Sequence, residues 1–161
     1  IAEQKKDFIW LRYETPQISQ GIVLYTFSYV SDSAFTKNYL MRVRDSVLKA
    51  NVPGPTEGSY MATERRVDQV FNILEHNGNY ASEMRGLWRL RNDFMGGPYV
   101  SLAVLDVANQ RVIVGYGYAY APNKDKRNYV RQIEAMLYSM KLNNQEQNDN
   151  MNMEVEVRPE S

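Results

Sequence analysis

Residues 115–121 read GYGYAYA and are followed by Pro122. Because side chains along a β-strand alternate between its faces, this stretch would place Tyr116, Tyr118 and Tyr120 on one face and only glycine and alanine on the other. The amphipathic segment that follows, residues 123–142, needs an apolar surface to pack on. We therefore predict that the tyrosine row is the sheet surface beneath this helix. The alternative is a platform that stacks a sugar or a peptide, while the flat glycine face would admit a neighbouring chain or a ligand.

The aromatic row also occurs earlier in the chain. The matched positions, 91 residues apart, are Ile22, Tyr25, Phe27 and Tyr29 with Ile113, Tyr116, Tyr118 and Tyr120. The helices that follow match as well, once one residue is absorbed in the preceding turn. Such internal similarity predicts two copies of a strand-strand-helix unit, over residues 6–50 and 98–142, with residues 51–97 inserted between them.

These units predict an α+β domain over residues 1–142, with a mostly antiparallel, twisted sheet and two helices packed on one face. A chain of 161 residues with 43% hydrophobic content is long enough for one core and too short for two ordinary domains. Residues 143–161 are polar, so we expect a mobile tail there, in which only MEVEV at 153–157 would pair as an edge strand.

The first helix is expected after SDS at 31–33, where any of these residues can cap it. The proline-rich segment NVPGPTEG at 51–58 would end it. Its apolar stripe would comprise Phe35, Tyr39, Val43, Val47 and Ala50.

The middle of the chain has a less regular pattern. We predict that residues 69–76 and 80–90 pair as a hairpin across Asn77-Gly78, because that dipeptide favours a tight reversal. A short helix over residues 67–74 is the alternative, since its apolar residues also fit a helical face.

Composition excludes several classes of function. Lys plus Arg and Asp plus Glu both number 19, so there is no overall positive field to attract nucleic acid or an anionic membrane. The chain has no cysteine and one histidine, which excludes thiolate metal sites and the usual zinc sites. Phosphate-loop, calcium-loop and dinucleotide motifs are missing, and we expect neither a metal nor a cofactor.

The stretch RGLWRLRND at 85–93 alternates basic and apolar residues around Trp88. In a strand, Arg89 and Arg91 would face away from Trp88, as a salt-bridged sheet surface or as a binding stripe. Tyr60, Trp88, Arg89 and Arg91 are the candidate ligand-binding residues. Two Gly-Pro loops at one end of the sheet supply the further candidates Pro53, Gly54, Pro55, Glu57, Gly96 and Gly97.

An enzyme would need other residues. His76 beside the Asn77-Gly78 turn could act as a general base, although an exposed turn residue is the simpler interpretation. Several carboxylates of the middle region could meet for acid-base chemistry, namely Glu57, Glu64, Asp68, Glu75, Glu83 and Asp93. Charged residues in half-exposed strands more often form a solvated face.

The segments RDSVLKANVPGPTEGSYM (44–61) and NDFMGGPYV (92–100) resemble those of a family of uncharacterised domains from Bacteroidetes, known as lipoproteins or envelope proteins. The resemblance extends over most of residues 6–142 and implies an exported, lipid-anchored location. This chain begins at Ile1 and lacks the family's signal segment and anchoring cysteine, so we expect it to be part of a longer protein. Any membrane association would then depend on an anchor outside this chain.

We therefore expect a non-catalytic binding or scaffolding domain of the cell envelope, with an unknown ligand or an envelope protein as its partner. The alternative is a hydrolase acting on glycan or peptide through the middle-region carboxylates. Two close carboxylates with shifted pKa values in a cleft would favour the enzyme, and an aromatic or basic surface without them would favour the binding domain.

Overall fold

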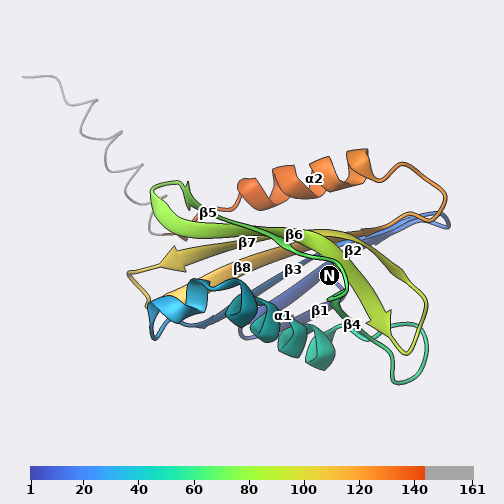
Figure 1. Ribbon diagram of the computed structural model, residues 1–161, viewed down its shortest axis with the longest axis horizontal. Coiled ribbons are helices and arrows are strands. Elements are labelled where there is room, and N and C mark those ends of the chain that lie inside the picture. The colour runs from blue at the N-terminus through green and yellow to red at the C-terminus, as the bar shows by residue number, and fades with distance from the viewer. Residues whose placement is uncertain (144–161) are drawn as a thin grey trace, which may run out of the picture.

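The computed structural model describes residues 1–143 and shows one antiparallel sheet with a helix on each side (Figure 1). The expected strand 153–157 lies outside these residues. The elements are β1 (Glu3–Lys5), β2 (Phe8–Glu14), β3 (Ser19–Ser28), a 3-10 turn η1 (Asp32–Phe35), α1 (Lys37–Asn51), β4 (Tyr60–Thr63), β5 (Val70–His76), β6 (Asn79–Arg91), β7 (Gly96–Asp106), β8 (Arg111–Tyr120) and α2 (Arg127–Tyr138). The strand order is β1-β2-β3-β8-β7-β6-β4, and β5 also pairs with β6. The predicted α+β class and antiparallel sheet are confirmed.

The middle segment forms the predicted hairpin. β5 pairs with β6 from Val70 opposite Arg85 to His76 opposite Asn79. The reversal at Asn77 and Gly78 has φ of 49° and 81°, and only a few residue types accept such left-handed angles. The alternative helix over residues 67–74 is therefore not formed.

The two helices lie on opposite faces of the sheet (Figure 1), which corrects the prediction that they share one face. The inner face, as we call the side covered by α1, carries Tyr116 and Tyr118 in one core cluster with Leu40 and Leu48. The outer face is covered by α2, whose Ile133 and Leu137 form a second cluster.

The tyrosine row therefore lies beneath α1 and not, as predicted, beneath the helix that follows it in the chain. The glycine face is the one that receives α2. A Cβ placed on Gly117 would lie 1.9 Å from Ile133 Cγ2, and one on Gly115 would lie 2.7 Å from Leu137 Cδ2. Both faces of β8 are apolar, so each needs its own cover, and the face without side chains allows the closest approach of a helix.

The duplicated unit is not confirmed. The two aromatic rows do share the inner face, because Tyr25 pairs with Val114 and Val23 pairs with Tyr116 in the β3–β8 ladder. A twofold relation between the units would place both helices on that face, whereas α1 and α2 are on opposite ones.

Helix α1 buries a different stripe from the one predicted. Its buried residues are Leu40, Met41, Arg44 and Leu48, while Tyr39, Val43 and Val47 are half-buried and Ala50 is exposed. The helix begins one turn later than expected, because residues 32–35 form the 3-10 turn and the Thr36 hydroxyl accepts the Tyr39 N–H as the cap. The hydrophobic pattern did not predict this stripe because one of its buried residues is an arginine, Arg44.

Candidate functional site

A pocket of about 510 Å³ opens at one end of the inner face, beyond the end of α1. Strands β2, β3, β4, β6 and β8 contribute to it, together with the segment after α1. Its lining residues are Trp10, Arg12, Glu14, Ser19, Val52, Pro53, Gly54, Pro55, Met61, Trp88, Leu90, Met95, Tyr118 and Tyr120. The pocket is large enough for one small ligand.

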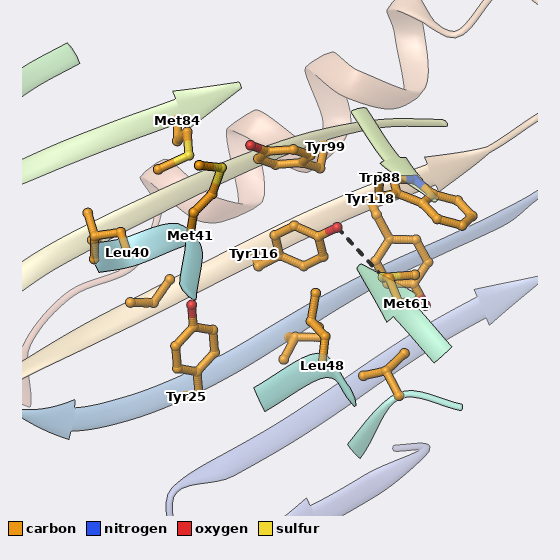
Figure 2. Packing of buried hydrophobic residues seen from close by; sticks show 14 of the residues in the cluster. Tyr25, Leu40, Met41, Leu48, Met61, Met84, Trp88, Tyr99, Tyr116 and Tyr118 are labelled. Carbon is orange, nitrogen blue, oxygen red and sulfur yellow. Dashed lines mark hydrogen bonds between the residues drawn. The ribbon is translucent and has the colours of Figure 1, made fainter. Parts of the chain in front are cut away.

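One wall of the pocket is a rigid aromatic cluster. Trp10 Nε1 donates to the Tyr118 hydroxyl at 2.9 Å, and Trp88 Nε1 donates to the Ala119 carbonyl at 3.1 Å. The ring centroids of Trp88 and Tyr118 are 5.7 Å apart in an edge-on arrangement. Figure 2 shows Trp88 and Tyr118 beside Met61, with Tyr116 to their left. Burial raises the pKa of Tyr118 to about 12, so its hydroxyl stays neutral.

The rim of the pocket is polar. Within the described part of the chain, Arg12 and Glu14 are the only charged lining residues, and Arg12 Nε lies 3.3 Å from Glu14 Oε1. The Arg12 guanidinium also lies over the Trp10 ring, 5.1 Å from its centroid. Both side chains are about half exposed, so their ion pair contributes little to stability and is free to exchange partners.

The opposite wall is the loop that follows α1, and hydrogen bonds hold it in place. Gly54 N–H donates to the Ser59 carbonyl at 3.0 Å, and the Thr56 hydroxyl donates to Asp93 Oδ2 at 2.6 Å. The latter bond ties this loop to the β6–β7 turn. Gly54 is required by space, since a Cβ there would lie 2.3 Å from Ser59 Oγ.

The predicted site residues separate into three groups. Trp88, Pro53, Gly54 and Pro55 line the pocket. Arg89, Gly96 and Gly97 line a second hollow of about 670 Å³, to which Trp88 also contributes. Tyr60, Glu57 and Arg91 line neither; Tyr60 pairs with Arg91 in the sheet and packs against the Lys49 ammonium, which is 5.3 Å from its ring centroid.

Most of the pocket was not anticipated from the sequence, namely Trp10, Arg12, Glu14, Ser19, Val52, Met61, Leu90 and Met95, whereas Tyr118 and Tyr120 belong to the row that the alternative interpretation made a ligand platform. Trp10 and Tyr118 are 108 positions apart and meet only because β2, β3 and β8 are neighbours. The available signal was the alternation of each strand, which places Trp10 and Tyr118 on faces that need cover.

Gly97 has a structural role in this wall. A Cβ at Gly97 would lie 2.1 Å from the Ala119 carbonyl oxygen, the atom that accepts the Trp88 indole N–H. We expect Gly97→Ala to lower the free energy of unfolding by about 1–3 kcal/mol, because backbone must move to admit the methyl group. Urea titration followed by tryptophan fluorescence measures this loss. Gly78→Ala is the comparison, because Gly78 is favoured by its backbone angle and not by lack of space. Its loss of unfolding free energy should come from the positive φ alone, since nothing lies within 4 Å of a Cβ there.

Two of the basic residues of β6, Arg85 and Arg89, form salt bridges, as one of the two sequence interpretations expected. Arg89 Nη1 lies 3.9 Å from Glu64 Oε2, and Arg66, outside β6, donates two side-chain hydrogen bonds and its backbone N–H to the same carboxylate. The hydrogen bonds from Arg66 lower the pKa of Glu64 to about 2. Glu64 is therefore ionised at neutral pH and unsuited to the role of a general acid.

A second ionic cluster joins β6 to α2. Arg85 Nε donates to Glu83 Oε1 at 2.5 Å, and its Nη2 donates to Glu134. The Tyr138 hydroxyl donates to Glu83. Burial alone would raise the pKa of Glu83, but the hydrogen bonds from Arg85 and Tyr138 outweigh it and hold the pKa below its usual value.

This cluster predicts a contribution to stability that depends on pH. The pKa of Glu83 is lower in the folded protein than the value of about 4.3 expected for the unfolded chain, so the contribution is complete above that value. It is lost as the pH falls below about 4.3 and through the lower folded value. We expect the stability difference between wild type and Glu83→Gln to shrink as the pH falls below about 5. Denaturation midpoints at each pH measure it, and a constant difference would contradict the assignment.

His76 is buried, in contrast to the exposed turn residue that the sequence suggested. Its Nε2 lies 2.7 Å from the Met140 carbonyl oxygen, and its ring packs edge-on against Tyr138 at 5.7 Å. The histidine thus joins the β5–β6 turn to the segment after α2. It lines neither the pocket nor the second hollow.

In residues 1–143, no three His, Asp or Glu side chains gather in a group that would hold a metal ion. None of the helices described is long and apolar enough to cross a membrane.

The fold and the pocket together define a small α+β domain with an open pocket that has an aromatic wall. The chain belongs to a family of domains of unknown function, DUF4837, which matches residues 1–139. No curated protein matches the sequence. One solved structure with a similar fold is a protein of unknown function from Pseudomonas aeruginosa, described as a suggested regulator. It has 8% sequence identity and a TM-score of 0.51, over 88% of this chain and 86% of that one, and its likeness concerns the fold alone.

Proposed function

We propose that this chain is a non-catalytic binding domain that holds the apolar part of a ligand in the pocket beyond α1. The observation that carries the proposal is the pre-formed aromatic wall, in which the indole N–H groups of Trp10 and Trp88 are already bonded within the protein. Such a wall offers ring faces and hydrophobic area, and it needs no rearrangement to receive a ligand.

The pocket's own chemistry supports binding over catalysis. Its two charged residues, among those described, are the exposed pair Arg12 and Glu14, and Tyr118 is kept neutral by its raised pKa. A general acid or base needs a pKa near the working pH. Tyr118 does not offer one, because burial raises its pKa to about 12.

A hydrolase remains the second candidate because Glu83 and Glu134 approach the same guanidinium. The lowered pKa of Glu83 and the bonds from Arg85 favour a structural tie between α2 and the sheet. Loss of a hydrolytic activity in Glu134→Gln, with unfolding unchanged, would favour the enzyme.

We propose a cell-envelope location, through an anchor outside this chain, and a bacterial source among Bacteroidetes. Both rest on the resemblance of residues 44–61 and 92–100 to envelope proteins. Fractionation of cells that express the full protein tests the location: recovery with soluble cytoplasmic markers would contradict it.

Intrinsic fluorescence tests the binding function directly, since the chain has 2 tryptophans and both line the pocket. The purified chain would be titrated with fatty acids, cell-wall glycan fragments, short peptides and divalent metals, and its melting temperature recorded in parallel. We expect one organic class to change the fluorescence and raise the melting temperature, because a ligand that binds only the folded state stabilises it. If every class leaves both signals unchanged, the binding function is refuted.

A further inference from the structure

We propose that the pocket receives the alkyl chain of a single-chain anionic amphiphile, with the anionic head at Arg12. This inference rests on the proposed binding function and names its ligand class. The shared chemistry is one saturated chain with a carboxylate or phosphate group, as in a fatty acid or a lysophospholipid.

The first reason is that the pocket's interior has few polar partners to offer. Its backbone donors are already used: Met61 N–H bonds to the Val52 carbonyl at 3.1 Å, Gly54 N–H to the Ser59 carbonyl at 3.0 Å, and Leu90 N–H to the Met95 carbonyl at 2.8 Å. The two indole N–H groups are used as well. A sugar or a peptide backbone would bring more polar groups than Ser19, Tyr120 and the rim pair can bond, and each buried group left without a partner is costly. An alkyl chain brings none.

The second reason is the shape and softness of the walls. Met61 and Met95 both line the pocket, together with Val52, Leu90 and the aromatic rings. Methionine side chains are unbranched and adapt to irregular contours, as a flexible chain requires. In Figure 2, Met61 lies against Tyr118 and accepts the hydrogen bond of the Tyr116 hydroxyl, at 3.6 Å from oxygen to sulfur.

The third reason is the placement of charge at the mouth. Stacking on Trp10 holds the Arg12 guanidinium beside the apolar interior, where it can meet an anionic head as the chain enters. Glu14, 3.3 Å from Arg12, competes for the same guanidinium and repels an anion. The two residues should therefore affect affinity with opposite signs.

The experiment measures binding of sodium decanoate, dodecanoate and tetradecanoate below their micelle concentrations, by tryptophan fluorescence and calorimetry. We expect affinity to rise roughly three- to fourfold for each added methylene, until the pocket is full and the increase stops. Glycerol monododecanoate supplies the same chain with a neutral head. Lysophosphatidylglycerol supplies a phosphate head. Tighter binding of this lipid or of the fatty acids shows whether the head group is a phosphate or a carboxylate.

Four variants locate the ligand. Arg12→Gln should weaken dodecanoate about fivefold or more and leave glycerol monododecanoate unchanged, and Glu14→Gln should strengthen dodecanoate. Met95→Trp should fill the pocket and weaken every chain about tenfold or more. Val107→Trp, at an exposed position in the turn between β7 and β8, is the control and should bind as wild type does.

The outcomes separate the two proposals. If glycan fragments or peptides change the tryptophan signal and dodecanoate does not, the binding function stands and the ligand class is overturned. Equal binding of dodecanoate to Met95→Trp and wild type also overturns it, because the chain then lies elsewhere. If no probe of any class binds, both proposals fail.

Discussion

Replacing Arg44 by methionine should raise the free energy of unfolding by about 1–3 kcal/mol, while replacing it by alanine should lower it by about 2–5 kcal/mol. Arg44 is 1% exposed, and no carboxylate among the described residues lies within ion-pair distance of it. A buried charge without a counter-ion is costly. Methionine removes the charge and retains most of the volume, whereas alanine leaves a cavity.

The bonds around Arg44 explain why methionine should leave few polar groups unsatisfied. Its Nη2 donates to the Thr63 hydroxyl at 2.8 Å and to the Tyr99 hydroxyl at 3.0 Å, while Nε has no partner. Thr63 also donates to Asp45 Oδ1 at 2.6 Å, and Tyr99 donates to Gln69 at 2.5 Å. Both hydroxyls thus keep a bond when the guanidinium is removed.

Opposing contributions come from the stacked rings. The Arg44 guanidinium carbon lies 4.3 Å from the Tyr99 ring centroid and 5.5 Å from that of Tyr116, which are favourable cation–π distances. Such contacts reach about 2 kcal/mol when desolvated, less than the cost of burying the charge. Urea denaturation of both variants measures the balance, with Arg42→Met on the exposed side of α1 as the control. A loss of 2 kcal/mol or more in Arg44→Met would show that the rings and hydroxyls outweigh the cost.

A more stable Arg44→Met protein would mean that the arginine is retained for something other than stability. Its guanidinium lies over the Tyr116 ring, and the Tyr116 hydroxyl donates a hydrogen bond to Met61 in the pocket wall. Ligand affinity of Arg44→Met would then show whether the charge acts on the pocket through these two residues.

The strands and the β5–β6 hairpin followed from the sequence because their signals are local. Alternation and the Asn77-Gly78 dipeptide act within a few residues, and the hairpin register follows from them. The basic stripe of β6 was foreseen for the same reason, since Arg89 and Trp88 must face opposite ways in any strand.

Helix placement and the pocket could not be read from the sequence because they depend on pairing between distant segments. An apolar stripe shows that a helix packs on a sheet and does not tell which face it covers. β8 was apolar on both faces, so α2 had two surfaces available, and Gly115 and Gly117 made the outer one the closer fit. The buried stripe of α1 was predicted wrongly because a charged residue such as Arg44 is expected to be exposed. Its neighbours on the inner face are tyrosines, whose rings can accept a cation.

Gly117→Ala should separate α2 from the sheet by enough to lower the free energy of unfolding by about 1–3 kcal/mol, since the new Cβ would lie 1.9 Å from Ile133 Cγ2. Ile133→Ala alone should cost about 2–5 kcal/mol, because the side chain is 1% exposed and leaves a cavity. In the double variant the methyl group at position 117 enters the space that Ile133 vacates. The double variant should therefore lose at least about 1 kcal/mol less unfolding free energy than the sum of the two single-variant losses. Denaturation of the four proteins in the cycle measures this coupling. Additive losses would mean that α2 does not pack against Gly117 as closely as described. Gly117→Ala combined with Met136→Ala is the control, and its losses should be additive because the Met136 side chain is half exposed.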